Sequence, residues 1–272
     1  MENLIQNIFH LLCVKDDVKP ESYIEDYFEE SFNETEDLFY HFGNKVNLKQ
    51  KKVLDIGCGY GSSCIYMALH GAAKVVGIDI DEDRINYAKS KLGNDYPNLS
   101  SFVDFRQAGS IIDEKFDIVI SKDSFMHYAD PENFVTNIKQ YLNQDSIIVI
   151  VFGPLWKAPY GGQIAYMTKV PWAHLLFPES VIMRERKRFR PNEDATSFEQ
   201  VKGSLNKMTF RRYMNIIKEN GLEVEYFKTN LTRRNSRAKF TTLFNFLRKI
   251  PFCQEFFTQN VYSIIRLRTL TR

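Results

Sequence analysis

The chain contains the stretch Val53-Leu54-Asp55-Ile56-Gly57-Cys58-Gly59-Tyr60-Gly61-Ser62. Its apolar start predicts a short buried strand, and the residues from Ser62 onward predict a helix. Glycines at alternate positions between them let the backbone turn tightly and approach a ligand without an intervening Cβ. The free N–H groups and positive dipole end of the helix favour an anionic group above the turn. The stretch therefore predicts a site for a nucleotide-like cofactor, with a plain tight turn as the alternative.

A second strand is predicted at Lys74-Val75-Val76-Gly77-Ile78-Asp79, and it ends in an acid. Asp79 lies 22 positions after Gly57. At that distance an α/β cofactor fold places a carboxylate on the two hydroxyl groups of a ribose. Nicotinamide and flavin dinucleotide sites need G-x-G-x-x-G, but residue 62 is Ser where the third glycine would stand. A dinucleotide enzyme is therefore kept only as an alternative.

The acid two residues before the first glycine and the G-x-G-x-G spacing resemble the class I S-adenosylmethionine-dependent methyltransferases. The resemblance covers roughly residues 50–153. It implies a Rossmann-like, doubly wound α/β sheet of seven strands, with strands six and seven antiparallel. S-adenosylmethionine would be the cofactor and S-adenosylhomocysteine the product. The resemblance assigns cofactor contacts to Asp55, Gly57, Cys58, Gly59, Gly61, Asp79, Ile80, Gly109, Ser110, Ser121 and Lys122.

Within that set, Asp55 and the glycine turn would seat the methionine end of the cofactor. Asp79 would bind the ribose, and Ile80 would lie beside the adenine. Members of the family commonly place an Asp after the third strand to meet the adenine amino group. This chain has Gly109 and Ser110 there. Backbone groups or the Ser110 hydroxyl would have to serve instead.

The other elements alternate as such a sheet requires. Apolar runs predict a third, a fourth and a fifth strand at residues 101–106, 116–120 and 146–152. The C-terminal part adds a helix at 209–220, a strand at 222–227, helical residues 243–257 and a last strand at 261–268. The basic segment 183–191, in contrast, is expected to be exposed and mobile.

Ser121-Lys122-Asp123-Ser124-Phe125-Met126-His127-Tyr128 follows the fourth strand. Open α/β sheets bind ligands beyond the carboxyl ends of their strands, so the transferred methyl group should emerge here. The segment resembles the Ser-Arg-Asp-x-x-x-His pattern of phosphoethanolamine methyltransferases and related small-molecule enzymes. By that resemblance Asp123 would face an amine or hydroxyl of the acceptor, and His127 would orient or deprotonate it. The alternative role for His127 is packing beside the cofactor.

Residues 154–205 depart from a minimal methyltransferase and hold both tryptophans of the chain. An insertion at this position usually forms the acceptor pocket. Its aromatic rings would hold a sugar, an apolar ring or a cationic amine. The candidates for lining that pocket are Trp156, Tyr160, Tyr166 and His174, and His174 is a second candidate base. The alternative is a small separate hydrophobic cluster.

The first fifty residues predict two helices, one over residues 3–14 and one opened by Pro20. In the resembled family such an N-terminal helix lies over the cofactor and substrate as a lid. Tyr23 or Tyr27 would then touch the methionine end or the acceptor. The alternative for either tyrosine is packing against the core.

The chain has 272 residues, of which 44% are hydrophobic and 26% charged, as in an ordinary soluble protein. It has no run of 18 apolar residues, no signal-peptide pattern and no paired metal-ligand spacing among its four cysteines. We therefore expect a cytoplasmic protein without a membrane span, with reduced thiols and no metal.

Charge is unevenly distributed along the chain. Residues 1–181 carry 16 Lys and Arg against 26 Asp and Glu, whereas residues 182–272 carry 20 against 8. The basic C-terminal third could attract an anionic substrate, RNA or an acidic membrane surface, or simply form a solvated face. The chain lacks the Asn/Asp-Pro-Pro-Tyr/Phe sequence that clamps a base amine and a Cys placed to attack a pyrimidine. Both absences argue against DNA and common RNA bases as acceptors.

These observations predict a helical cap at residues 1–50, a cofactor-binding core at 51–153, an insertion at 154–205 and completion of the sheet at 206–272. The expected activity is methyl transfer to oxygen or nitrogen of a small molecule, such as a sugar, a lipid headgroup or a secondary metabolite. An RNA- or protein-directed methyltransferase and a non-catalytic cofactor-binding subunit are the alternatives. A monomer or a homodimer is expected.

Overall fold

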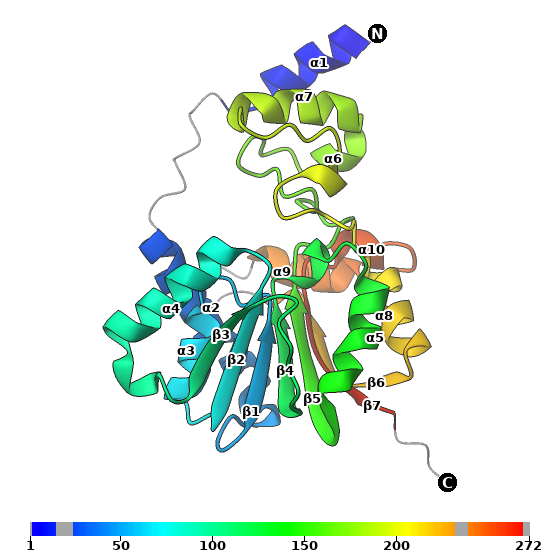
Figure 1. The fold of residues 1–272 in the computed structure, drawn as a ribbon. Coiled ribbons are helices and arrows are strands. Elements are labelled where there is room, and N and C mark those ends of the chain that lie inside the picture. Colours follow the sequence, from blue (N-terminus) through cyan, green and yellow to red (C-terminus); the bar gives the residue numbers. More distant parts are fainter. Residues whose placement is uncertain (1, 15–23, 232–238, 269–272) are drawn as a thin grey trace.

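The computed structural model describes residues 2–14, 24–231 and 239–268. In these residues the strands form one seven-stranded sheet in the order β3-β2-β1-β4-β5-β7-β6 (Figure 1). β1 to β5 are parallel, whereas β7 is antiparallel to both of its neighbours, β5 and β6. The bounds are Lys52–Ile56 (β1), Lys74–Asp79 (β2), Val103–Gln107 (β3), Phe116–Lys122 (β4), Leu142–Phe152 (β5), Leu222–Thr229 (β6) and Val261–Leu267 (β7). The predicted sheet, with its antiparallel pair β6 and β7, is confirmed.

Helices cover both faces of the sheet. They are α2 (Ile24–Phe42), α3 (Ser62–Leu69) and α4 (Glu82–Asp95) on one face, and α5 (Pro131–Ile138) and α8 (Phe210–Glu219) on the other. Successive residues of one strand face opposite layers: Val53 packs with the first group of helices and Leu54 with the second. Strands buried on both faces explain why the central strands are continuous apolar runs.

Element boundaries differ from the sequence prediction by a few residues. β5 begins at Leu142 rather than 146, because Leu142 pairs with Phe116 at the start of β4. The helix predicted at 209–220 is α8, and the Thr209 side chain caps it by accepting a hydrogen bond from the Arg212 N–H at 3.2 Å. The strands and helices of the core thus stand where the periodicity placed them.

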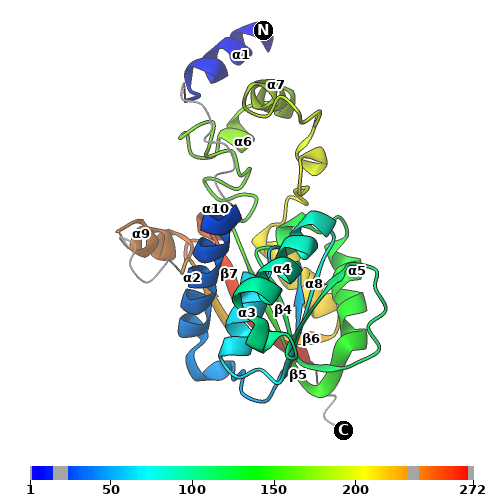
Figure 2. The same cartoon turned by 60° about the vertical axis from the view of Figure 1, so that its left-hand side comes forward.

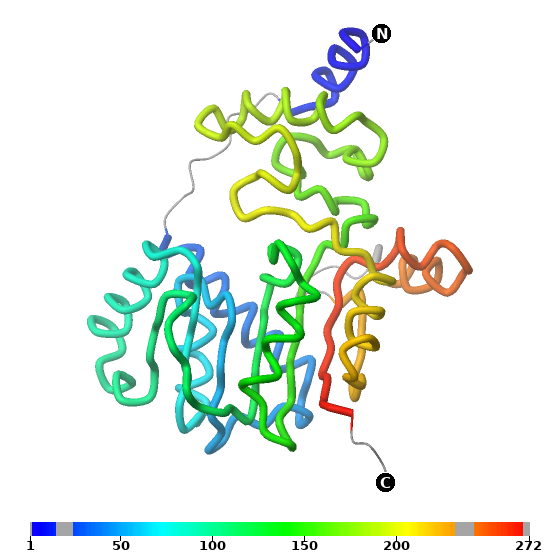
Figure 3. The backbone as a smooth tube through the Cα atoms, turned by 45° about the vertical axis from the view of Figure 1, so that its right-hand side comes forward, coloured from blue at the N-terminus to red at the C-terminus, as the bar shows by residue number. Residues whose placement is uncertain are grey.

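The insertion forms a layer beyond the sheet, with residues 2–11 on its outer side and the end of β7 near the opposite end of the molecule (Figure 3). It contains α6 (Ala173–Leu176) and α7 (Glu179–Phe189), and α1 (Glu2–Leu11) packs on α7. Phe9 of α1 is fully buried, with its ring centroid 4.6 Å from that of Phe177. The two helices expected to form one cap are therefore separated, because α2 packs on α3 instead.

The prediction that residues 183–191 are exposed holds for only part of the segment, including Arg184, Lys187 and Arg188. Most of this segment lies in α7, where Met183 and Glu185 are buried. The Arg186 guanidinium donates to both carboxylate oxygens of Glu193, at 3.0 and 3.1 Å. The run of charges concealed an apolar face and an internal ion pair, and together these order the helix.

α9 (Lys239–Leu247) and α10 (Gln254–Phe257) form a helical hairpin between β6 and β7, and α9 projects from the body of the molecule (Figure 2). Two asparagines close the base of this hairpin. Asn260 accepts from the Leu231 N–H at 3.0 Å and donates to the Leu231 carbonyl at 2.8 Å. Asn230 accepts from the Gln259 N–H at 2.7 Å and donates to the Phe257 carbonyl at 2.8 Å. We call these residues the neck of the hairpin.

Among the described residues, every helix is too short or too polar to cross a membrane.

Candidate functional site

The glycine turn leads from the end of β1 into α3, and each of its three glycines has a positive φ: 81° at Gly57, 55° at Gly59 and 86° at Gly61. Two of them also lie against other side chains. A Cβ on Gly57 would overlap Ser124, and a Cβ on Gly61 would stand 2.6 Å from the Phe105 ring. A Cβ on Gly59 would meet no protein atom within 4 Å. The turn is therefore open at Gly59, where a ligand could approach the backbone closely.

Asp79 ends β2 beside this turn. One of its carboxylate oxygens accepts from the Gly59 N–H at 2.8 Å, and the other accepts from the Asp81 N–H at 2.9 Å. A carboxylate can accept about four hydrogen bonds, so capacity for two ribose hydroxyls remains. The next residue, Ile80, is 84% exposed, which offers an apolar surface where a planar base would lie.

Asp55 and Cys58 lie on the inner side of the turn. The Asp55 carboxylate is buried and accepts a hydrogen bond from the Cys64 thiol at 3.4 Å. Burial raises the pKa of this carboxyl to about 7. The Cys58 N–H donates to the Ile78 carbonyl at 3.0 Å. In this structure both groups support the turn from within.

The loop after β3 contains Gly109, with φ of 92°, and Ser110. Both residues are exposed, but the Ser110 hydroxyl donates to the Gln107 carbonyl at 2.7 Å within its own loop. The Ser110 N–H donates to the same carbonyl at 3.2 Å, so both donors of Ser110 already have a partner within the loop.

A buried network joins the end of β1 to the turn after β4. The Tyr128 hydroxyl donates to the Ile56 carbonyl at 3.0 Å and lies 3.0 Å from the Ser121 hydroxyl. Ser124 donates to the Gly57 carbonyl at 3.1 Å. Ser121 is fully buried, so it supports the turn rather than lining a cavity. The sequence assigned no role to Tyr128, although it fixes the distance between the two turns.

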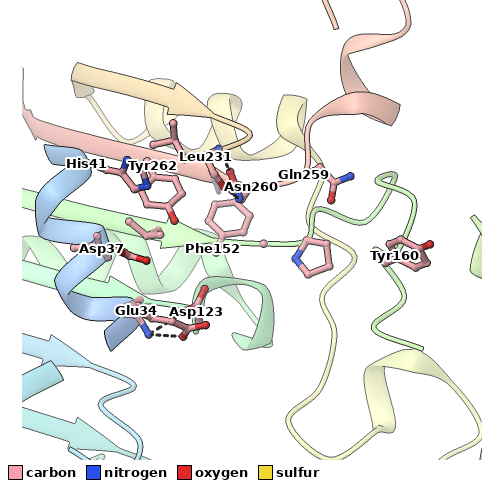
Figure 4. A pocket seen from close by; sticks show the side chains of 15 residues that line it. Glu34, Asp37, His41, Asp123, Phe152, Tyr160, Leu231, Gln259, Asn260 and Tyr262 are labelled. Carbon is pink, nitrogen blue, oxygen red and sulfur yellow. Dashed lines mark hydrogen bonds and ion pairs between the residues drawn. The ribbon is translucent and has the colours of Figure 1, made fainter. Parts of the chain in front are cut away.

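Lys122 and Asp123 follow this network at the end of β4. The Lys122 ammonium lies 3.3 Å from carboxylate oxygens of both Glu34 and Asp123 (Figure 4). Burial disfavours the charged form of Lys122, but the two carboxylates outweigh it and raise its pKa. Partial removal from water raises the pKa of the Asp123 carboxyl, against the opposing effect of the Lys122 ammonium. Asp123 remains half-exposed.

These side chains line a cavity of about 410 Å³. Figure 4 shows that α2 contributes one wall and that the ends of β4 and β5 and the neck of the hairpin contribute the others. Its charged and aromatic lining includes Glu34, Asp37, Lys122, Asp123, Tyr160 and Tyr262. The cavity therefore lies beyond the carboxyl ends of the strands, where open α/β sheets bind ligands.

His127 is not among the residues that line this cavity, and its ring lies beside Gly203. Its Nδ1–H donates to the Ser204 carbonyl at 2.7 Å. Because a carbonyl can only accept, this bond leaves Nε2 of the neutral ring as a proton acceptor. Asn206, two residues after Ser204, joins this part of the chain to the turn after β4. Its side chain donates to the Phe125 and Tyr128 carbonyls, both at 2.9 Å. Asn206 carried no signal in the sequence that could have singled it out.

His174 lies apart from these residues, inside the insertion. Its Nε2–H donates to the Trp156 carbonyl at 2.5 Å, and its Nδ1 is buried without a partner among the described residues. Burial lowers the pKa of His174, so its ring stays neutral. Trp156 packs edge-on against both His174 and Phe198, with centroids 4.9 and 5.0 Å away. The structure does not bring His174 to the cavity beside Asp123.

The predicted tyrosines fall in different places. Tyr160 lines the cavity beside Asp123. Tyr27 lines a second, larger cavity of about 970 Å³ between the glycine turn and the insertion, and its ring lies 5.5 Å from that of Tyr60. Tyr166 packs within the insertion, where its hydroxyl accepts from Arg186 at 2.7 Å. Tyr23 lies outside the described residues.

Comparison with known proteins bears on this arrangement. Residues 47–153, which include the glycine turn, Asp79 and the turn after β4, match the family model described as a methyltransferase domain. These residues form a class I S-adenosylmethionine-dependent methyltransferase domain. S-adenosylmethionine is the cofactor of this domain, and the open turn at Gly59, the carboxylate of Asp79 and the exposed Ile80 fit it.

Curated relatives of the methyltransferase domain include N- and O-methyltransferases. The chain is 38% identical over 104 residues to phosphoethanolamine N-methyltransferase 1 of Arabidopsis thaliana, which covers 36% of this chain and 20% of that protein. It is 34% identical over 116 residues to a ubiquinone biosynthesis O-methyltransferase of Glaesserella parasuis, which covers 40% of this chain and 49% of that protein. The chain thus spans a fifth to a half of the length of these relatives.

Solved structures share the fold over most of the chain. Magnesium protoporphyrin IX methyltransferase of Synechocystis, solved with S-adenosylhomocysteine, is 15% identical with a TM-score of 0.52, over 98% of this chain and 100% of that one. Geranyl diphosphate C-methyltransferase of Streptomyces coelicolor is 14% identical with a TM-score of 0.55, over 88% and 79%. At identities this low, the similarity shows only that the chain shares the fold of these proteins over most of its length.

Proposed function

We propose that the chain is an S-adenosylmethionine-dependent methyltransferase that methylates an oxygen or nitrogen atom of a small molecule. The observation that carries this proposal is the cavity of about 410 Å³ beside Asp123, at the end of the strand adjacent to the glycine turn. A cavity of this size suits a small ligand. Sugars, lipid headgroups and secondary metabolites are the candidate acceptors.

The charge of the cavity favours an acceptor that carries an amine. Three carboxylates line it, those of Glu34, Asp37 and Asp123, against the single ammonium of Lys122. Tyr160 and Tyr262 add aromatic surface, which attracts cations. One similar protein is named an N-methyltransferase and another an O-methyltransferase. Both nitrogen and oxygen are therefore proposed as acceptor atoms.

When bound, the cofactor supplies a methyl group that its sulfonium already makes electrophilic. The contribution of the protein is to hold the acceptor lone pair in line with it and to take the proton that the acceptor loses. The Asp123 carboxyl lines the cavity, and its raised pKa favours proton uptake. His127, with Nε2 as an acceptor, is the second candidate for this step.

The test uses methyl-labelled S-adenosylmethionine, the purified 272-residue chain and a host extract split into small-molecule, glycan and lipid, RNA and protein fractions. We expect label in the small-molecule or the glycan and lipid fraction. Asp123→Asn should lower the transfer rate about 10- to 100-fold while cofactor binding survives, because one proton acceptor is lost.

Asp130→Asn is the matched control for that variant. Asp130 caps α5 by accepting from the Asn133 N–H at 2.9 Å, and Asn caps a helix as well as Asp does. Its transfer rate should equal that of the unaltered chain. Label in RNA or protein would overturn the small-molecule proposal. Cofactor binding without label in any fraction would favour a non-catalytic subunit.

A further inference from the structure

The α9–α10 hairpin exposes large apolar side chains. Phe252 is 94% exposed and Phe246 is 65% exposed, and Leu243, Ile250 and Phe256 are exposed as well. Phe252 lines one groove with Ile250 and another with Phe256, so these three side chains form a connected surface. Together with Leu243 and Phe246 of α9, which packs on α10, we call them the hairpin tip. Proteins that work free in solution rarely leave such a surface uncovered.

Cationic side chains surround the hairpin tip. Lys249 is exposed beside Ile250, and the Lys157 ammonium lies 5.8 Å from the centre of the Phe256 ring. Arg211 of α8 lines the same groove as Phe252 and Phe256. Three acids also line this groove: Glu132 pairs with Arg212, Glu255 accepts from the Phe210 and Arg211 N–H groups at the start of α8, and Glu219 is exposed. The other groove holds Arg248 and Lys249 and no acid.

The neck connects the hairpin tip to the cavity. Leu231, Gln259 and Asn260 belong to the neck and also line the cavity beside Asp123. Because side-chain bonds of Asn230 and Asn260 close the neck, the tip has a fixed place next to the cavity mouth. A surface that binds the tip would therefore lie close to where an acceptor enters.

We propose that the hairpin tip docks the protein on the surface of a membrane that contains anionic lipid. Exposed Phe, Leu and Ile side chains enter the boundary between headgroups and acyl chains, and the surrounding Lys and Arg pair with lipid phosphates. Attachment of this kind needs no membrane-spanning helix. One further step rests on the proposed function: docking presents the cavity to lipid headgroups, so the acceptor is a headgroup or another membrane-held molecule.

The composition of the hairpin tip favours lipid over nucleic acid. Single-stranded nucleic acids bind aromatic faces that line a basic groove, whereas Leu243 and Ile250 offer no face on which a base can stack. A bilayer accepts aliphatic and aromatic side chains alike. The excess of positive charge in residues 182–272 complements an anionic membrane.

The test is flotation with vesicles of phosphatidylcholine, alone or mixed equally with phosphatidylglycerol. The chain should bind the mixed vesicles and much less the neutral ones, and salt should weaken binding. Phe246→Ser combined with Phe252→Ser should reduce binding at least about tenfold. Ile111→Ser is the matched control, because Ile111 is 89% exposed in another loop. Thermal unfolding of each variant should match that of the unaltered chain.

Equal vesicle binding by the unaltered chain and the double variant would overturn the docking proposal. A loss with Leu11→Ser in that case would place the membrane contact on α1, since Leu11 belongs to its exposed apolar side. If the chain transfers methyl groups but does not bind vesicles, the docking proposal is refuted and the proposed methyltransferase function stands. Vesicle binding without methyl transfer does the reverse.

Discussion

The two halves of the ligand-binding edge of the sheet are built differently. At the glycine turn, residues 55 to 79 supply the turn itself, and Ser124 and Tyr128 brace it from the turn after β4. Its carboxylates are already paired: Asp79 holds two backbone N–H groups and Asp55 holds a thiol. At the cavity beside Asp123, the walls come from α2, from β4 and β5, and from the neck. There the charged groups border an open space.

This difference separates a fixed function from an adjustable one. A cofactor that is the same in every enzyme of the family can be held by a rigid, self-consistent local turn. An acceptor that differs between enzymes needs walls that can change independently. Variants in the first half should therefore affect cofactor binding or folding, whereas variants in the second half should affect acceptor use.

The largest expected effect is that of Asp79→Ala. The variant loses a charged acceptor for two ribose hydroxyls, and hydrogen bonds to charged groups contribute about 1.5–3 kcal/mol each. We expect cofactor affinity, measured by calorimetry, to fall by about 100-fold or more. Glu82→Ala, an exposed acid three residues away, is the control. Affinity equal to that of the unaltered chain would remove Asp79 from the cofactor site.

Alanine at Gly61 and at Gly59 should separate folding from binding. A methyl group on Gly61 would meet the Phe105 ring at 2.6 Å, so we expect the free energy of unfolding to fall by about 3 kcal/mol. A methyl group on Gly59 meets no protein atom within 4 Å. That variant should lose only about 1 kcal/mol of stability but bind cofactor at least about tenfold more weakly. The reverse pattern in urea unfolding and calorimetry would refute the ligand-facing assignment of Gly59.

Asp55→Asn tests the interior of the same half through pH. The folded state holds the proton of Asp55 up to about pH 7, whereas the unfolded carboxyl loses it near its ordinary pKa of 3.8. The unfolded state thus binds fewer protons between these values, and this group lowers the free energy of unfolding as pH rises. The free energy of unfolding of the variant, relative to that of the unaltered chain, should be about 3 kcal/mol larger at pH 8 than at pH 5. A difference that does not vary with pH in urea titrations would argue against a protonated Asp55.

Glu34→Gln tests the other half and should have the smallest effect. It keeps the shape of the side chain but removes one of the two carboxylates next to Lys122. For the labelled acceptor, we expect KM to rise about tenfold with cofactor affinity unchanged. Glu36→Gln, an exposed residue of the same helix, is the control. A change in cofactor affinity instead would place Glu34 in the cofactor half.

The cofactor half could be predicted from the sequence because its geometry is local. Alternate glycines and the acids at 55 and 79 specify the strand–turn–helix and its partner strand within one continuous segment. The same reasoning could not identify Glu34 as a partner of Lys122, since the two lie 88 positions apart. Nor could it find Asn206, whose bonds to Phe125 join residues 81 positions apart.

The two candidate histidines show where residue type misleads. Both stand near aromatic residues in the sequence, and both are of the residue type that most often serves as a general base. The structure gives His127 a carbonyl partner at the edge of the strand-end region and buries His174 under Trp156. Likewise, the charges of α7 suggested exposure because an ion pair such as Arg186–Glu193 is invisible without tertiary contacts.

The neck of the α9–α10 hairpin has a consequence for how such a protein diversifies. Because Asn230 and Asn260 close the connection at its base, β6 and β7 keep their register whatever the chain does between residues 231 and 259. A replaced or lengthened connection would change the wall of the cavity and the surface beside it together. Exchange of this one segment could thus give the same catalytic frame a new acceptor and a new location in a single evolutionary step.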